Sequence, residues 1–548
     1  MIIGWGGIFS TTAQPSNDLA SVDLRLSDYL QQVLHYNQSL QAQMIDAEAQ
    51  TYKLKSEKGI FEPDFEASYT HQWDKRQNNT QQQAEQDASP LFIDRNNIYD
   101  GGVEALIPTG AKIRLGVTVS DLYNNVNPVA SLGATPANQF NREFQSFAGV
   151  SVTQPLLKNG WFGPVMVNIR LAALDSQIAF EEYRRQVMLT MYQAEGAYWN
   201  LYFAQEQIHF FDDSVTAAQD VLNDSQEKLK TGQGAQLDVM EAQSALALRD
   251  TKRNDAVQSY YEALGHLQVL AGVSPNPNQP GSGSPMFRAV DDPHTSNSPP
   301  TYAETYEEGF TQNPDYLIQQ EKMNQERLRL GVAKNQVLPE LDAKADYGYN
   351  GLGLTPGQSW DQLGSEEYPS WDAGIQLTIP LGGNIKGRAD LKGARLHLQE
   401  AYINLKGVET EMANSLSASI QKARAWQQSI QSYETVVNYD QQVFQTQLAR
   451  LKAGTVDAQS VLNAEADWLD ARQDMAGAFS EYHKTLLDIE LADGALLKDN
   501  NLEVTRDELR QQTEEMLEHN QGYAVKNVPP PPDELFSPVP PPTTNAPD

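Results

Sequence analysis

Apolar and small residues recur at alternating steps of three and four along two stretches of this chain that contain no proline. These stretches lie between Pro164 and Pro275 and between Pro380 and Pro529. The seam positions are Val187, Met191, Ala194, Tyr198, Leu201, Ile208, Phe211, Val215, Ala218 and Leu222 in the first stretch, and Tyr402, Leu405, Met412, Leu416, Ala423, Trp426, Ile430, Tyr433, Val437, Phe444 and Leu451 in the second. A seam held over about seven heptads predicts coiled-coil helices of roughly 60 residues, or about 90 Å.

A glycine stands where each seam stops. Lys230 and Gly232 end the first seam, and Lys452 and Gly454 end the second. A basic residue followed by glycine is typical of a helix C-terminus and a turn. Each stretch is therefore predicted to form a helical hairpin with its tip at the glycine. Whether these glycines only cap the helices or also support docking is left open at this point.

Other segments alternate strictly between apolar and polar residues, which predicts strands with one apolar face. The apolar positions are Phe65, Ala67 and Tyr69; Ile113, Leu115, Val117 and Val119; Leu341, Ala343, Ala345, Tyr347 and Tyr349; and Trp371, Ala373, Ile375, Leu377 and Ile379. Such a face can pack on a soluble core or contact lipid in an outer-membrane barrel. Periodicity alone does not separate the two.

The chain contains the same unit twice. Pairs such as Ala172 and Ala394 lie 222 residues apart, the motifs beginning at Ala148 and Ala373 lie 225 apart, and Asn37 and Asn313 lie 276 apart. The change of offset places 51 additional residues in the first repeat. Part of this insertion, residues 101–120, reads as an additional hairpin that turns at Pro108-Thr109-Gly110. The first repeat is expected to supply four strands and the second repeat two.

This duplication divides the chain into five expected regions. They are a leader remnant or linker (1–22), repeat one (23–272), a Pro/Ser-rich linker (273–300), repeat two (301–495), and an acidic helix with a proline-rich, disordered tail (496–548). The N-terminal stretch has no basic residue before Arg25, which favours a truncated or misassigned signal segment.

Composition excludes several classes of function. With 72 acidic and 40 basic residues, the chain lacks the basic surface that nucleic-acid binding requires. It has no cysteine, its eight histidines show no metal-ligand spacing, and no glycine-rich loop follows a predicted strand. We therefore expect no enzyme activity, no cofactor and no metal. No run of eighteen apolar residues occurs, so contact with a bilayer would have to be made by strands.

Two kinds of protein remain. About six strands are too few to close a barrel, so a barrel would need several chains. Aromatic residues near the predicted strand ends favour it, as an interfacial girdle would: Tyr99, Tyr123, Trp161, Phe162, Trp360, Tyr368 and Trp371. The alternative is a coiled-coil scaffold protein, whose strands form a sheet capping the helical hairpins.

The order of these elements resembles the TolC-like outer-membrane efflux channels. The resemblance rests on two Ala-Gly strands that end in Pro-Leu (148–156 and 373–381), on the Lys-x-Gly tips, and on the Asp238-Val239-Met240-Glu241-Ala242-Gln243 motif; it covers residues 23–495. It implies an α+β membrane protein with two internal repeats. Three chains would share an outer-membrane β-barrel, continued by a long periplasmic α-helical coiled-coil barrel.

The resemblance also implies partners and sites. A periplasmic adaptor (membrane fusion protein) would dock at the tips, Lys230, Gly232, Lys452 and Gly454, and link the channel to an inner-membrane pump. The pore constriction would involve Asp238, Glu241, Asp457, Ser460 and Asn463. A basic residue expected two positions after the second glycine is Val456 here, so the constriction would be held differently. The exported substrate, the pump class and the place of the additional hairpin stay open.

Overall fold

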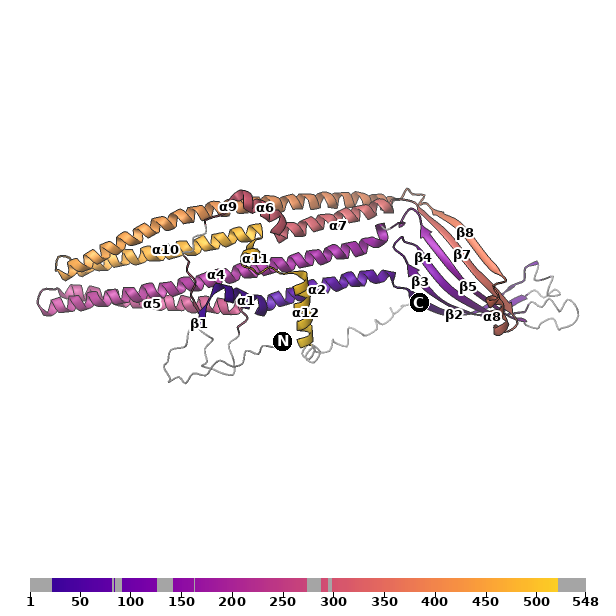
Figure 1. Cartoon of the computed structure of the whole chain (residues 1–548), viewed down its shortest axis with the longest axis horizontal. Helices are drawn as coiled ribbons and strands as arrows, with labels where there is room; N and C mark the ends of the chain where they lie inside the picture. The colour runs from indigo at the N-terminus through magenta and orange to yellow at the C-terminus, as the bar shows by residue number, and fades with distance from the viewer. Residues whose placement is uncertain are drawn as a thin grey trace, which may run out of the picture.

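The computed structural model describes residues 22–80, 83, 91–125, 141–161, 163–273, 287–293 and 298–520. The molecule is long, with helices over most of its length and one sheet at the end opposite the helix tips (Figure 1). The helices are α1 (Leu26–Tyr36), α2 (Gln38–Lys58), η1 (Gly59–Phe61), α4 (Gly163–Lys230), α5 (Gln236–Leu270), α6 (Tyr302–Gln312), α7 (Pro314–Gln336), α8 (Pro356–Gly364), α9 (Ile385–Lys452), α10 (Ala458–Asp493), α11 (Leu496–Asp499) and α12 (Arg506–Asn520).

Two helices of equal length form the body of the molecule. Helices α4 and α9 each contain 68 residues, somewhat more than the seams predict, and each ends at the lysine before a tip glycine. Helix α5 returns along α4, and α10 returns along α9 (Figure 1). Toward the sheet, α2 packs on α4 and α7 packs on α9, so that each repeat keeps two helices side by side up to the sheet.

The seam of α4 differs from the prediction in its middle. Ile208, Phe211 and Val215 are only partly buried, whereas Phe210 and Ser214 are buried in their place. An α-helix with 3.6 residues per turn drifts by about 20° per heptad against a strict repeat of 3.5. The contact face of α4 has therefore moved by one residue along this stretch.

In both repeats, an asparagine side chain ties two helices together. This contact is called here the asparagine clasp. Asn37 caps the N-terminus of α2, and Asn313 caps that of α7. The Asn37 Nδ2 donates to the carbonyl of Leu270 at 3.1 Å, and the Asn313 Nδ2 donates to that of Ala492 at 2.8 Å. Each returning helix is thus tied to the start of the helix that leads to the sheet.

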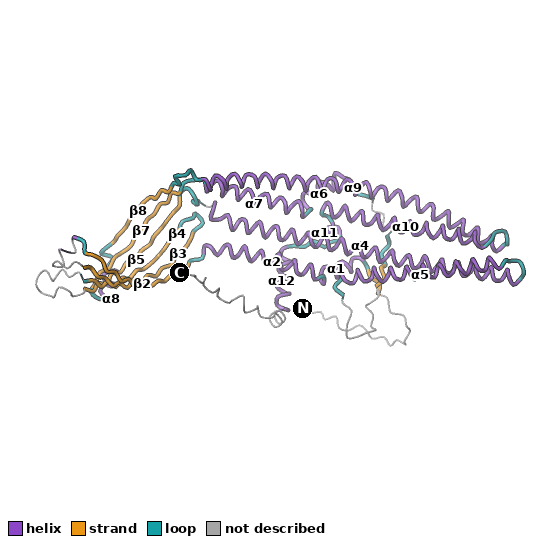
Figure 2. Tube along the Cα trace, turned by 180° about the vertical axis from the view of Figure 1, so that it is seen from behind, coloured by secondary structure: helices purple, strands orange, loops and turns teal. Residues whose placement is uncertain are grey.

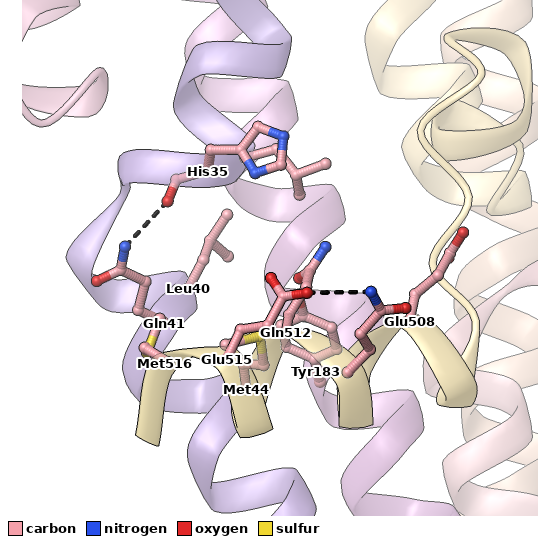
Figure 3. Close-up of a pocket in the computed structure, with 11 residues that line it drawn as sticks. His35, Leu40, Gln41, Met44, Tyr183, Glu508, Gln512, Glu515 and Met516 are labelled. Carbon is pink, nitrogen blue, oxygen red and sulfur yellow. Dashed lines mark hydrogen bonds between the residues drawn. The ribbon is translucent and has the colours of Figure 1, made fainter. Parts of the chain in front are cut away.

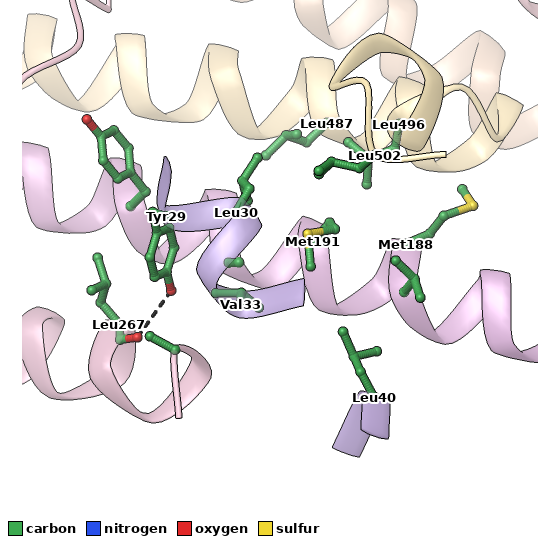
Figure 4. Packing of buried hydrophobic residues seen from close by; sticks show 14 of the residues in the cluster. Tyr29, Leu30, Val33, Leu40, Met188, Met191, Leu267, Leu487, Leu496 and Leu502 are labelled. Atoms are coloured by element: carbon green, nitrogen blue, oxygen red, sulfur yellow. Dashed lines mark hydrogen bonds between the residues drawn. The ribbon is translucent and has the colours of Figure 1, made fainter. Parts of the chain in front are cut away.

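The largest apolar cluster lies near the middle of the molecule, where α1, α2, α4, α5 and the C-terminal helices meet (Figure 4). Leu30, Met191 and Leu496 are almost completely buried there. The Tyr29 hydroxyl donates to the Leu267 carbonyl at 3.2 Å, so this buried phenol keeps a hydrogen-bond partner. The cluster joins the two ends of the first repeat to the C-terminal segment.

Within the described residues, the sheet contains six antiparallel strands in the order β2-β3-β4-β5-β7-β8 (Figure 2). The strands are β2 (Asp64–Gln77), β3 (Leu91–Leu106), β4 (Lys112–Asn124), β5 (Asn141–Pro155), β7 (Glu340–Gly353) and β8 (Pro369–Thr378). Four strands come from the first half of the chain and two from the second. Strands β3 and β4, which contain the additional hairpin, lie within the sheet between β2 and β5.

A second, small sheet pairs β1 (Val22–Leu24) with β6 (Phe287–Ala289) in parallel. Val22 belongs to the region expected as a leader or linker, and β6 lies inside the region expected as an irregular linker, so both expected regions contain some regular structure. The remainder of residues 1–22, most of the Pro/Ser-rich linker and the proline-rich tail lie outside the described residues. The acidic segment before the tail forms α12.

Two sequence expectations about the sheet region need correction. Tyr99 lies in the middle of β3, opposite Val119, rather than at a strand end. Trp360 lies in helix α8, which the alternation of apolar residues did not predict. Pro356 at the first turn and the Thr355 side chain at the N-cap start this helix. Phe162 lies outside the described residues.

Candidate functional site

The two faces of the sheet differ in chemistry over most of its height. At the strand ends far from the helices, Arg95 and the ion pair of Asp121 with Arg142 fall on the otherwise apolar side. The register places the Tyr69, Tyr99 and Val119 side chains in one row on the same face. Many residues of this apolar face are exposed in the single chain: Phe65, Tyr69, Trp73, Val103, Leu115, Val150, Tyr347, Trp371, Ile375 and Leu377. Phe65 is 73% exposed and Ile375 is 75% exposed, so most of this face is uncovered in the described part of the chain. Helix α8 packs on one end of the face, where the Ser359 hydroxyl lies 2.7 Å from that of Ser146.

On the opposite face, called here the polar face, the charged side chains are mostly carboxylates. The register places these charged residues on it: Glu66, Asp74, Asp94, Asp100, Glu104, Asp342, Asp346 and Asp372, with Arg76, Lys112, Arg114 and Lys344. Asp346 and Asp372 lie directly opposite each other, an arrangement of like charges that destabilises a sheet. An acidic face of this kind favours cations in the water beside it.

At the other end of the molecule, the two tips have the same backbone. Gly232 has φ 75° and Gly454 has φ 74°, the left-handed conformation that glycine adopts without a Cβ clash. Lys230 and Lys452 are the last residues of α4 and α9, and the lysines and glycines are all exposed. The glycines therefore do cap the helices, and they leave two similar loops open to solvent.

Two of the predicted constriction residues cap the returning helices, and a third, Ser460, donates to one of them. In the first repeat, Asp238 in the first turn of α5 accepts from the Ala235 N–H at 3.3 Å. In the second repeat, Asp457 is the N-cap of α10 and accepts from the Ser460 N–H at 2.9 Å. The Ser460 hydroxyl donates to the same carboxylate at 2.5 Å, and the two hydrogen bonds from Ser460 lower the pKa of Asp457. The capping carboxylate therefore lies at a different position in each repeat. It is in the first turn of the helix in the first repeat and at the N-cap in the second.

The two remaining constriction candidates lie one turn further along. Glu241 is partly buried, and Asn463 is exposed and accepts from the Gln459 amide at 2.8 Å. The structure brings the five candidates together at the tip end of the molecule, on α5, on α10 and at the N-cap of α10.

The tips of the two repeats pack on each other. A buried cluster takes residues from all four tip helices: Ala218, Val221, Leu222, Val239, Ala242, Phe444, Leu451, Ala458, Val461, Leu462 and Ala464. The Lys228 ammonium donates to the carbonyl of Leu451 in the other hairpin. The two hairpins of one chain therefore form a single four-helix unit at this end.

Above this cluster lies a buried ion pair that sequence reasoning missed. Arg249 on α5 is 9% exposed and Glu465 on α10 is 2% exposed, and both guanidinium nitrogens that face Glu465 donate to its Oε2. The Ser214 hydroxyl of α4 donates to the other carboxylate oxygen, and Arg249 also donates to the Leu462 carbonyl at 3.3 Å. This network joins the first hairpin to the second in the interior of the tip unit.

A group of carboxyls lies farther from the tips, between α4 and the end of α10. Burial, together with the neighbouring Glu195 and other acids, raises the pKa of Glu490 to about 8. Burial raises the pKa of Glu195 and of Asp493 to about 7. The native protein therefore holds protons at these positions near neutral pH, where an unfolded chain would not.

Stability is expected to fall with rising pH because of this group. The pKa of Glu490 is about 4.5 when unfolded and about 8 when folded, so the folded state binds more protons between these values. The melting temperature should decrease from pH 5 to pH 8. Glu490→Gln should flatten this dependence and raise the melting temperature at pH 8 by several degrees, as thermal unfolding would show. Asp470→Asn, an exposed change on the same helix, is the control; an equal response of both variants would contradict the assignment.

The described residues contain a cleft of about 480 Å³ between α12 and the junction of α1 and α2 (Figure 3). His35, Met44, Tyr183 and Glu515 are among its lining residues. Among all the residues that the structure describes, no three His, Cys, Asp or Glu side chains are grouped so that they could hold a metal ion. None of the described helices combines the length and the hydropathy that a membrane crossing requires.

Comparison with known proteins gives consistent results. The family model described as "Outer membrane efflux protein" matches residues 114–273 and 307–495. The chain is 21% identical to the alkaline protease secretion protein AprF of Pseudomonas aeruginosa, over 62% of this chain and 68% of that one. It is 22% identical to the outer membrane protein TolC of Vibrio cholerae, over 70% and 85%.

Solved structures share the fold. The Campylobacter jejuni CmeC outer membrane channel matches with a TM-score of 0.57 and 16% identity, over 89% of this chain and 89% of that one. The outer membrane protein VceC of Vibrio cholerae matches with a TM-score of 0.57 and 15% identity, over 86% and 96%.

Proposed function

This chain belongs to the outer membrane efflux protein family, and we propose that three copies of it form one conduit, closed by strands in the outer membrane and continued by helices through the periplasm. The protein is an outer-membrane exit channel for efflux or secretion and is not an enzyme. Because the chain belongs to this family, the alternative of a coiled-coil scaffold protein is no longer needed.

The proposal rests on a sheet that exposes an apolar face and has two unpaired edge strands. Among the described strands, β2 and β8 each pair on one side only. An isolated sheet with such edges and an exposed apolar face would aggregate in water. Pairing of β8 with β2 of the next copy would close the wall, and the apolar face would then contact lipid while the polar face lined water.

At the other end, the proposed trimer would bring six tips together around an aperture. Lys230 and Lys452 at the helix ends, and Gly232 and Gly454 in the turns, are exposed residues that a periplasmic adaptor would contact. Asp238, Glu241, Asp457, Ser460 and Asn463 would line the aperture. Since Asp238 and Asp457 already accept backbone hydrogen bonds, we assign them to holding the shape of the loops as well as to the charge of the constriction.

Conduction would be passive. An inner-membrane pump and its adaptor would load the cargo, and movement of the helix tips would open the aperture. The acidic polar face would favour cations and disfavour anions in the wide part of the conduit.

Planar-bilayer recording with the purified protein, together with its mass in detergent, tests this proposal. We expect a trimer with cation-selective conductance. Glu241→Ala should weaken selectivity without loss of trimer mass, because Glu241 has no capping role to lose. Glu411→Ala, an exposed acid far from the tips on α9, is the matched control. A monomer without conductance would overturn the proposal, and equal responses of the two variants would remove Glu241 from the constriction.

A further inference from the structure

The hairpin made of β3, β4 and their turn (Leu91–Asn124), called here the inserted hairpin, distinguishes the two repeats. In the second repeat, β7 pairs directly with β8, and Ala345 lies opposite Ala373. Their equivalents by internal alignment are Tyr69 in β2 and Ala148 in β5. In the first repeat two further strands stand between these partners, so the inserted hairpin interrupts a pairing that the second repeat retains.

The register shows that the insertion fits the wall. Across the inserted hairpin, Ala148 connects through Val117 and Gly101 to Ala67, two residues from Tyr69. Two added strands restore the antiparallel direction, and a shift by two residues keeps every side chain on its face because the side-chain period is two. Strands β2 and β5 therefore remain antiparallel to each other, and each keeps its apolar side chains on the same face of the sheet, as if the two strands were paired directly.

Side chains of the inserted hairpin are sorted in the same way as those of its neighbours. Tyr99 and Leu115 are 50% and 60% exposed on the apolar face. On the polar face, the Thr118 hydroxyl donates to Asp100 at 2.7 Å, and Arg114 pairs with the same carboxylate. A plug or a flap beside the sheet would not need this alternation.

The turn of the inserted hairpin is fixed at the junction of sheet and helices. The Trp161 N–H donates to the Thr109 carbonyl at 2.9 Å, and the Thr109 hydroxyl donates to Gln154 at 2.9 Å. Gly110 has φ 86°, and a Cβ there would lie 2.7 Å from the Asn159 carbonyl oxygen. The chain turns back here without entering a helix. The insertion therefore adds strands to the wall and adds nothing to the helical part.

We propose that the inserted hairpin widens the outer-membrane end of the conduit and sets the size of solute that this end admits, an inference that rests on the trimer proposed above. Three six-stranded sheets give eighteen strands, where the same sheets without the inserted hairpin would give twelve. Barrel diameter grows roughly linearly with strand number, so the pore is about one and a half times as wide.

A deletion of residues 91–124 tests the width. Neutral polymers of graded size, added only on the sheet side of the bilayer, enter the wide part of the pore regardless of the aperture at the tips. We expect the radius at which polymers stop lowering the conductance to fall by about a third in the deletion variant. An unchanged exclusion radius in a trimeric, conducting deletion variant would overturn the inference and leave the channel assignment intact.

A pair of cysteine variants tests the same inference in the full-length protein. Since the chain has no native cysteine, Ser120→Cys and Val119→Cys place single thiols on the polar and the apolar face of β4. A charged, membrane-impermeant thiol reagent should reduce the conductance of Ser120→Cys by a measurable step and leave Val119→Cys unlabelled in the bilayer. Labelling of both, or of neither, would show that the inserted hairpin lies outside the wall. Loss of trimer and conductance in the unsubstituted protein would instead count against the proposed function.

Discussion

Glu465→Ala is expected to destabilise the protein by about 3–5 kcal/mol, among the largest effects of any single substitution in the helical part. The change would leave the Arg249 guanidinium buried without its counter-charge, and the Ser214 hydroxyl without its acceptor. The cost of a buried unpaired charge exceeds the net contribution of the pair itself. Denaturant unfolding followed by far-ultraviolet circular dichroism would measure the loss.

The double variant Arg249→Met with Glu465→Leu is the informative control. It removes both charges and keeps apolar volume among Leu462, Val461 and the other residues of the tip cluster, so most of the lost stability should return. Arg253→Met, which removes a half-exposed ion pair with Asp212 between α5 and α4, should cost about 1 kcal/mol or less. If the double variant is as unstable as Glu465→Ala, shape at this site and not charge pairing holds the hairpins together.

Periodic patterns in the sequence predicted the main helices and strands of this molecule. The glycines at 232 and 454 end the two helices, and strict alternation places Leu115 and Ile375 on one face of the sheet. These features are local, because a helix end or a strand face is determined by neighbouring residues. The open question of the additional hairpin was answered only by the pairing of β3 with β2.

The buried ion pair escaped prediction because charged residues on an amphipathic helix usually face water. A signal was present in the internal alignment. Arg249 is equivalent to Ala471, and Glu465 is equivalent to Gln243. The first of these differences replaces a small residue with a large charged one, and the second adds a charge. In the structure both lie where the repeats contact each other.

Contacts between distant segments could not be read from local patterns at all. Strand β1 pairs with β6 across more than 260 residues through three residue pairs. Helix α8 is nine residues long and packs beside β7, where the Ser146 hydroxyl lies 2.7 Å from that of Ser359. Short elements of this kind carry too few residues for a periodic signal, and their partners are decided by the tertiary fold.

Gly494→Ala is expected to destabilise the protein by about 3 kcal/mol, since it combines a strained backbone with a steric clash. Gly494 ends α10 with φ 84°. A Cβ there would lie 2.4 Å from the Gln312 carbonyl carbon and 2.5 Å from the Asn313 nitrogen, which are backbone atoms with no freedom to rotate away. Thermal unfolding of the variant would measure the loss.

Because the asparagine clasp occurs in both repeats, the first repeat supplies a control for this prediction. Gly272→Ala meets the same obstacle in the first repeat, where the Cβ would lie 2.6 Å from the Tyr36 carbonyl oxygen at φ 66°, and should cost a similar amount. Gly477→Ala lies inside α10 with no atom within 4 Å of the added Cβ, and should stabilise the helix by about 0.5–1 kcal/mol. Equal responses at 477 and 494 would show that close approach of the helices at the clasp is not required. A loss at 494 without one at 272 would mean that only the second repeat depends on its clasp, and that the first is held by the buried cluster around Tyr29 and Leu267.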